Sequence, residues 1–169
     1  TPGYDLFFDG AVGRDLLDEV LAAGAVRVET PALQIARVAA GVPWFADALS
    51  NDIIPPEANL DEPVSTSKGC YPGQEVVARI LNLGQIARRL MCLKAPGSHE
   101  TAPGTELTSK EGKAAGVLTS IAYDPSTDTT HALGFVKRPF WEEGSQLTAG
   151  VSEFSVRGPA RGQTPDSES

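Results

Sequence analysis

The N-terminal part of the chain alternates between short apolar runs and a longer run with helical spacing. Residues 4–8 and 25–29 are rich in aromatic or β-branched residues, which predicts two strands, and Val26 and Val28 share one face of the second. Between them, residues 12–23 repeat leucine and valine at intervals of three and four positions, which predicts an amphipathic helix.

Glycine and proline mark the expected helix ends. Gly24 is a plausible stop for the first helix. A second helix is predicted from Pro31, at the first helical position, to about Ala40, with Thr30 as its N-cap. Residues 41–43 (Gly-Val-Pro) then end it, and this strand–helix–strand–helix order is typical of an α+β domain.

Residues 44–67 show little periodicity. The proline pair at 55–56 and Pro63 are expected to keep the chain extended. We expect an ordered loop rather than a linker, because it carries apolar side chains that need burial, namely Trp44, Phe45, Ile53, Ile54 and Leu60.

The pattern changes to short strands separated by turns in the C-terminal half. The turns carry Pro-Gly, Glu-Gly or Asp-Pro pairs, which favours a small antiparallel β-barrel. The predicted strands cover residues 85–94, 106–109, 116–123, 131–137, 146–149 and 153–156.

Three regions follow from these patterns. Residues 1–84 form part of an α+β domain, residues 85–157 form the barrel, and residues 158–169 are a Pro/Gly/Ser-rich, polar tail that we expect to be disordered. The chain begins without Met, so we expect it to be a piece of a longer protein.

Charge and composition narrow the class of function. The formal net charge of −8, without a basic stripe, argues against a nucleic-acid partner. No apolar run approaches the roughly 20 residues that span a bilayer, so no membrane partner is expected.

The two cysteines, Cys70 and Cys92, make neither a disulfide framework nor a zinc site, which favours a reducing, cytoplasmic location and no bound metal. Cys92 alternates with apolar neighbours in a predicted strand and is expected to be a core residue.

The candidate chemistry lies in residues 68–75, Lys-Gly-Cys-Tyr-Pro-Gly-Gln-Glu. Pro72 and Gly73 fit the centre of a type II turn that leads into a short helix predicted from Gln74 to about residue 81. The free N–H groups of a helix start, together with Lys68, lower the pKa of a nearby thiol and favour its thiolate. Cys70 is therefore a candidate reactive cysteine.

Each of these residues also has a structural interpretation. Cys70 is then a small buried residue on a tight turn, and Lys68 a solvated charge. Glu75 only favours the helix dipole, or pairs with Arg79 one turn later. Arg37, on the second predicted helix, is either a surface charge or an anchor for a carboxylate, and Trp44 is expected to be a packing residue.

The motif resembles the K-G-C-Y-x-G-Q-E signature of the YgfZ family. The likeness extends upstream to residues 40–43 and 54–60, and downstream through Arg79 to Gly84 and to Arg89-Leu90. The strand at 116–120 is similar to that of the barrel shared with the aminomethyltransferases. The resemblance implies the C-terminal part of an aminomethyltransferase-like folate-binding fold followed by the barrel.

The resemblance also implies a function and a set of site residues. Proteins of this family bind tetrahydrofolate or a derivative and support iron–sulfur cluster assembly or repair, which makes folate and iron–sulfur client or assembly proteins the expected partners. Cys70 and Lys68 would carry the chemistry, and the motif loop would be completed by Gly69, Tyr71, Gly73, Gln74, Glu75 and Arg79. Tyr4 and Arg37 fall where relatives contact folate or substrate, whereas a tryptophan that lines the folate hole in some relatives corresponds to Leu33 here.

Two other functions stay open. One is a folate-dependent aminomethyltransferase or demethylase, although the glycine-cleavage enzyme lacks the cysteine of the motif. The other is a non-catalytic scaffold whose barrel and acidic surface bind a protein. The sequence leaves open whether the protein turns over a substrate.

Overall fold

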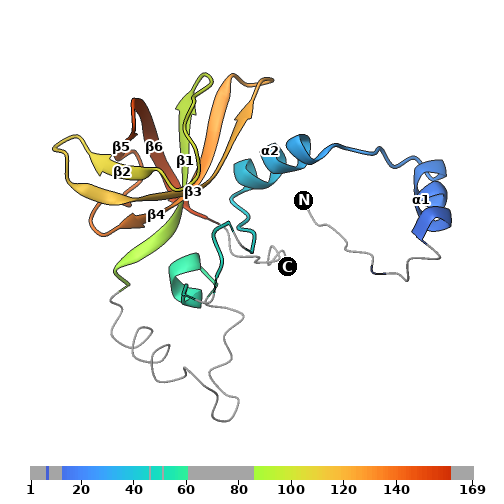
Figure 1. The fold of residues 1–169 in the computed structure, drawn as a ribbon, viewed down its shortest axis with the longest axis horizontal. Helices are drawn as coiled ribbons and strands as arrows, with labels where there is room; N and C mark the ends of the chain where they lie inside the picture. The colour runs from blue at the N-terminus through green and yellow to red at the C-terminus, as the bar shows by residue number, and fades with distance from the viewer. Residues whose placement is uncertain (1–6, 8–12, 46, 51, 61–85, 161–169) are drawn as a thin grey trace, which may run out of the picture.

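The computed structural model describes residues 7, 13–45, 47–50, 52–60 and 86–160. The described chain consists of a helical N-terminal part followed by a β-barrel, and α1 stands apart from the barrel at the end of an extended segment (Figure 1). The predicted strand at 4–8, apart from Phe7, and the predicted helix at 74–81 lie outside the described residues.

Two α-helices appear where the apolar spacing predicted them. Helix α1 spans Gly13–Ala22, and Gly24 follows it with a positive φ of 100°. Helix α2 spans Thr30–Ala40 and ends at Gly41, whose φ of 77° and N–H bonds to Arg37 and Val38 carbonyls close the last turn.

Three expectations for the N-terminal part are wrong. Thr30 is the first residue of α2, and Glu29 is the N-cap, without a side-chain cap hydrogen bond. Residues 25–29 are extended but form no strand, because no strand of the described chain lies beside them to complete a ladder. The proline pair does not extend the chain; Pro55–Ala58 form a 3₁₀-helix, η1, since a fixed proline φ suits a first helical turn that needs no N–H donor.

The barrel consists of antiparallel strands that close in the order β1-β4-β3-β2-β5-β6. The strands are β1 (Arg88–Pro96), β2 (Glu106–Ser109), β3 (Ala114–Asp124), β4 (Thr129–Lys137), β5 (Gln146–Ala149) and β6 (Ser152–Pro159). The predicted small antiparallel barrel is thereby confirmed, and the structure shows that it is closed. Strand β6 runs on to Pro159 and Ala160 is buried, so these positions belong to the barrel and not to the predicted tail; residues 161–169 are not described.

Alternation along the strands sorts side chains into an inner and an outer cluster. The inner cluster fills the barrel and includes Leu93, Leu118 and Phe154. The outer cluster joins Leu90, Leu133 and Phe135 of the barrel to side chains of the preceding segment, namely Val38 of α2 and Ala48. The segment from α2 to η1 is therefore packed on the barrel wall.

Candidate functional site

The motif predicted to carry the chemistry lies outside the described residues. Tyr4 and the motif residues all lie outside the described residues: Lys68, Gly69, Cys70, Tyr71, Gly73, Gln74, Glu75 and Arg79. Their roles stay predictions. The structure does describe the chain on both sides of the motif segment, up to Leu60 before it and from Ile86 after it.

An ion pair joins the two flanks of the motif segment. Glu57, in η1, accepts hydrogen bonds from Nε and Nη2 of Arg88 at 3.0 and 3.1 Å. The Glu57 side chain is only 12% exposed, and Arg88 also lies over the Phe135 ring at 5.0 Å. The planar guanidinium makes two parallel bonds, so the pair fixes direction as well as distance.

Asn59 adds a second link between the same flanks. It follows η1 with φ 59° and ψ 33°, a left-handed conformation that asparagine tolerates better than most residues. Its Nδ2 donates to the carbonyl oxygens of Leu90 and Ala160, both at 2.9 Å. One amide therefore ties the chain before the motif to the first strand and to the residue after the last strand.

The chain after the motif enters the barrel beside a group of cations. The Arg138 N–H donates to the Ala87 carbonyl at 3.1 Å. The guanidinium groups of Arg89 and Arg138 lie over the Trp141 ring at 5.4 and 6.0 Å. Within the described chain, the buried Nε of Arg89 has no hydrogen-bond partner.

Arg37 is buried, so the surface-charge interpretation of this residue is wrong. Its side chain is 4% exposed and bonds to Gln34 on its own helix, to the Val42 carbonyl at 2.9 Å and to Asp47 at 3.0 Å. Nη2 also donates to Ser120 Oγ on β3 at 3.2 Å. Burial lowers the pKa of Arg37 and the Asp47 carboxylate opposes that effect, while the guanidinium remains charged at neutral pH.

These contacts make Arg37 a junction between α2, the loop after it and the barrel. The carboxylate-anchor role stays a prediction, and a ligand carboxylate would have to share the guanidinium with Asp47. Trp44 lies against Arg37 with its ring centroid 4.8 Å from Cζ, and is 39% exposed. Phe45 is 74% exposed, so the expected burial of these two aromatic residues is wrong in this structure.

Cys92 has the packing role expected of it. It is half-buried on the outer face of β1 and packs against the cluster that contains Leu90 and Leu133. Its Sγ lies 3.8 Å from the Pro159 carbonyl oxygen. The described residues contain no group of three His, Cys, Asp or Glu side chains that could hold a metal ion.

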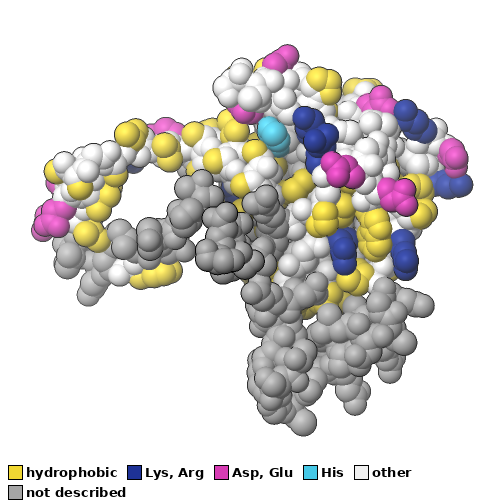
Figure 2. Space-filling model, turned by 180° about the vertical axis from the view of Figure 1, so that it is seen from behind, with side chains coloured by type: hydrophobic (Ala, Val, Ile, Leu, Met, Phe, Trp, Pro, Cys, Tyr) yellow, Lys and Arg dark blue, Asp and Glu magenta, His cyan; other side chains and the backbone are white. Residues whose placement is uncertain are grey.

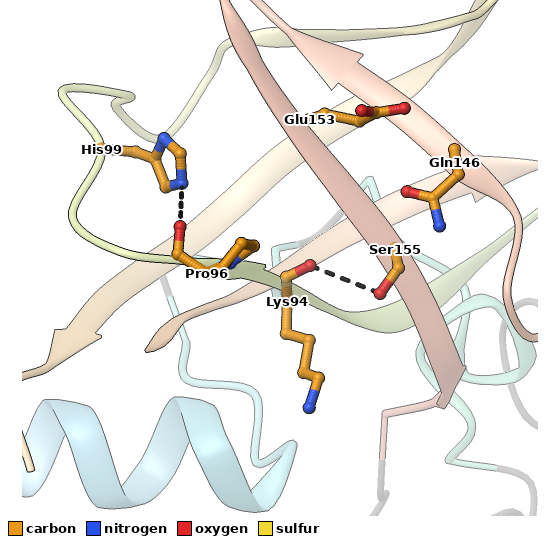
Figure 3. A pocket seen from close by; sticks show the side chains of 6 residues that line it. All are labelled: Lys94, Pro96, His99, Gln146, Glu153 and Ser155. Carbon is orange, nitrogen blue, oxygen red and sulfur yellow. Dashed lines mark hydrogen bonds between the residues drawn. The ribbon is translucent and has the colours of Figure 1, made fainter. Parts of the chain in front are cut away.

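A shallow hollow of about 350 Å³ lies on the barrel wall (Figure 3). Its lining comes from β1, the loop after it, β5 and β6, and consists of Lys94, Pro96, His99, Gln146, Glu153 and Ser155. Ser155 Oγ donates to the Lys94 carbonyl at 3.5 Å, and a His99 ring nitrogen lies 2.8 Å from the Pro96 carbonyl. None of the predicted site residues lines this hollow, and its mixed charges favour no single ligand.

Sequence reasoning missed Glu57, Asn59 and Arg88. Asn59 lies inside the 54–60 segment that carried the family resemblance, which was the available signal. The Glu57–Arg88 contact spans 31 positions along the chain, so no local pattern could indicate it.

No helix in the described part is long and apolar enough to cross a membrane.

The barrel matches a known domain family. Residues 88–161 match the glycine cleavage T-protein C-terminal barrel domain. A chloroplastic protein of Arabidopsis thaliana, named only provisionally as a transferase, is 33% identical over 78% of this chain and 30% of its own length. An aminomethyltransferase of Rippkaea orientalis is 28% identical over 92% of this chain and 41% of its own length.

A YgfZ protein and a solved aminomethyltransferase structure are also similar to this chain. The tRNA-modifying protein YgfZ of Sodalis glossinidius is 39% identical over 44% of this chain and 24% of its own length. The crystal structure of the glycine cleavage aminomethyltransferase T from Bartonella henselae matches 88% of this chain and 43% of that chain with a TM-score of 0.70 at 24% identity, which shows a shared fold. The chain spans less than half the length of each of these relatives.

Proposed function

We propose that this chain, whose residues 88–161 match the glycine cleavage T-protein C-terminal barrel domain and part of which is similar to YgfZ, acts within a tetrahydrofolate-binding protein that supports iron–sulfur cluster assembly or repair. The observation that carries the proposal is the motif at residues 68–75, in which a cysteine stands beside a lysine on a glycine-rich turn before a predicted helix. The family resemblance supplies folate and the iron–sulfur role.

In this proposal Cys70 acts as a thiolate toward a cluster, a persulfide or a one-carbon unit on folate. Lys68 and the predicted helix start lower the pKa of the thiol, which raises the thiolate fraction at neutral pH. Gln74 and Glu75 position the turn. The ion pair of Glu57 with Arg88 supports the proposal, because it ties both flanks of the motif segment to one end of the barrel.

The aminomethyltransferase relatives favour one rival function. They are similar over 92% of this chain, so a folate-dependent transferase or demethylase is the second candidate. If this second candidate is correct, the protein turns over an aminomethyl or N-methyl donor, and its activity does not require Cys70. A protein-binding scaffold predicts client binding without folate, and no described contact favours it.

The YgfZ relative is named a tRNA-modifying protein, which suggests a role in tRNA modification as another candidate function. A charge of −8 without a basic stripe provides little to bind tRNA phosphates. We therefore propose that any such role passes through a partner protein rather than through direct contact between this chain and RNA.

The test is rescue of a strain that lacks its own YgfZ-type protein. The complete protein that carries this chain is supplied as wild type, as Cys70→Ala and as Cys92→Ala, and activity of a cluster-dependent enzyme is measured. We expect wild type and Cys92→Ala to restore activity and Cys70→Ala to fail. Equal rescue by all three would show that Cys70 is structural, and rescue by none would favour the transferase function.

A thiol titration separates chemistry from folding. In a Cys92→Ala background, the rate of alkylation of Cys70 is followed against pH. We expect an apparent pKa below the ordinary value of about 8.5. A value at or above 8.5 in a folded protein would contradict the thiolate mechanism, even if the cysteine proved necessary in cells.

Folate binding by these 169 residues alone is expected to be weak. The chain matches less than half of its relatives' length. The family resemblance implies that part of the folate pocket comes from the other half. Calorimetric titration with tetrahydrofolate checks this expectation. Tight one-to-one binding by the chain alone would contradict it.

A further inference from the structure

Arg89 lies at one end of the barrel interior. Along β1, Met91, Leu93 and Ala95 belong to the inner cluster, whereas Leu90 belongs to the outer one. Side chains alternate between the two faces of a strand, so Arg89 continues the inner row. Its Nε is buried, and within the described chain it has no hydrogen-bond partner. A buried donor without an acceptor costs free energy, so an acceptor bound at this position would be favourable.

Arg138 and Trp141 lie at the same end of the barrel. Arg89 is opposite Val136 of β4, an inner residue, and Arg138 follows two positions later, where its N–H donates to the Ala87 carbonyl. The Trp141 ring packs against the inner cluster and lies 5.4 Å from the Arg89 guanidinium and 6.0 Å from that of Arg138. One ring therefore holds two guanidinium groups, and a guanidinium on a ring face keeps N–H groups at its edge for a ligand.

Neither of these guanidinium groups has a carboxylate partner in the described chain. Figure 2 shows Lys and Arg side chains interspersed with Asp and Glu side chains over the visible face of the barrel. The ion pairs among the described residues belong to Arg37, Arg88, Lys110 and Lys113. Glu142 and Glu143, next to Trp141 in the sequence, are exposed and form none of these pairs. Two neighbouring like charges without a counter-charge attract an anion.

Burial separates Arg89 from the other unpaired cations of the barrel. Lys94, Lys137 and Arg157 are exposed, so water solvates their charges. Arg89 is half-buried, and a charge partly removed from water binds an anion with less competition from solvent. Arg138 is exposed, which leaves one side of the pair open to solvent and gives a small anion access.

We propose that Arg89, Arg138 and Trp141 form a binding site for a small molecule that carries an oxyanion, either a carboxylate or a phosphate group. The guanidinium N–H groups donate to the oxygens of the ligand, and the Trp141 ring holds both guanidinium groups in place. Two cations provide too few phosphate contacts for a nucleic acid. The proposal does not rest on folate or on Cys70.

Nuclear magnetic resonance of the nitrogen-15-labelled chain tests the site directly. Inorganic phosphate and succinate are added separately, and sodium chloride of equal ionic strength is the reference. We expect the Trp141 indole N–H and Arg89 Nε–H signals to shift to saturation with phosphate, with succinate or with both, and not with chloride. Saturation by only one of them identifies the chemical group that the site prefers. Linear responses to both that match the response to chloride would overturn the proposal.

A matched pair of variants identifies the residues. Arg138→Gln changes an exposed side chain, so the fold is retained, and the Kd for the saturating anion is expected to rise at least about tenfold with the loss of a charged donor. Arg157→Gln, at another exposed arginine of the barrel, should leave the Kd within about twofold. Binding that survives Arg138→Gln, or that Arg157→Gln weakens equally, would overturn the proposal.

Discussion

At the scale of single residues, Arg37 shows how burial changes the role of a charge. Its guanidinium bonds to Asp47, to the Val42 carbonyl and to Ser120, and so joins α2, a loop and the barrel. Hydrogen bonds to charged groups contribute more than neutral ones, and a partner left without its donor adds a desolvation cost. Arg37 is therefore a stabilising residue whatever ligand it also contacts.

Replacing Arg37 should destabilise the fold measurably. We expect Arg37→Met to lower the free energy of unfolding by about 2 kcal/mol. Asp47→Asn should cost less than about 1 kcal/mol, because the Asp47 carboxylate is 42% exposed and water replaces the lost partner. Urea denaturation of the two variants measures both values. A loss for Arg37→Met no larger than that for Arg157→Met, at an exposed arginine, would show that the junction contributes nothing.

At the scale of elements, the main junction is η1 against the first strand. Glu57 and Asn59 reach Arg88, Leu90 and Ala160, so the flanks of the motif segment are joined at one place. We expect Glu57→Gln to lower the free energy of unfolding by about 1 kcal/mol, because the carboxylate is mostly buried and its pairing with Arg88 is bidentate.

Another ion pair provides the matched control for Glu57. Glu111 contacts Lys113 at 2.7 Å, with both side chains about 70% exposed, as their values of 71% and 69% show. Glu111→Gln should therefore change stability by less than about 0.5 kcal/mol. Equal effects of the two substitutions in urea denaturation would mean that η1 is not held by its ion pair.

The barrel elements were predictable because their pattern is local. Alternating side chains and turn pairs predicted β2 and β5 with the bounds that the structure shows, and located the other strands within a few residues. Residues 25–29 have the same pattern, and the strand predicted there is wrong, because a strand requires a pairing partner that the local sequence does not indicate. The Glu57–Arg88 contact and the burial of Arg37 depend on packing between residues far apart in the sequence, so no periodic pattern indicates them.

At the scale of the whole molecule, the described chain has two parts of unequal importance for stability. The segment from α2 to η1 covers the outer face of the barrel, where Val38 and Ala48 pack with Leu90, Leu133 and Phe135. Helix α1 and residues 25–28 bury no side chain. Stability of the chain alone should therefore depend on the first part and not on the second.

Two truncations test this division. Removing residues 1–28 keeps Glu29, the N-cap of α2, and should leave the free energy of unfolding within about 0.5 kcal/mol of the intact chain. Removing residues 1–85 returns much of the outer cluster to water and should cost about 3–6 kcal/mol, the order expected for uncovering two large apolar side chains. Urea denaturation followed by circular dichroism measures both. A large loss in the shorter truncation would show that α1 packs within this chain and contributes to its stability.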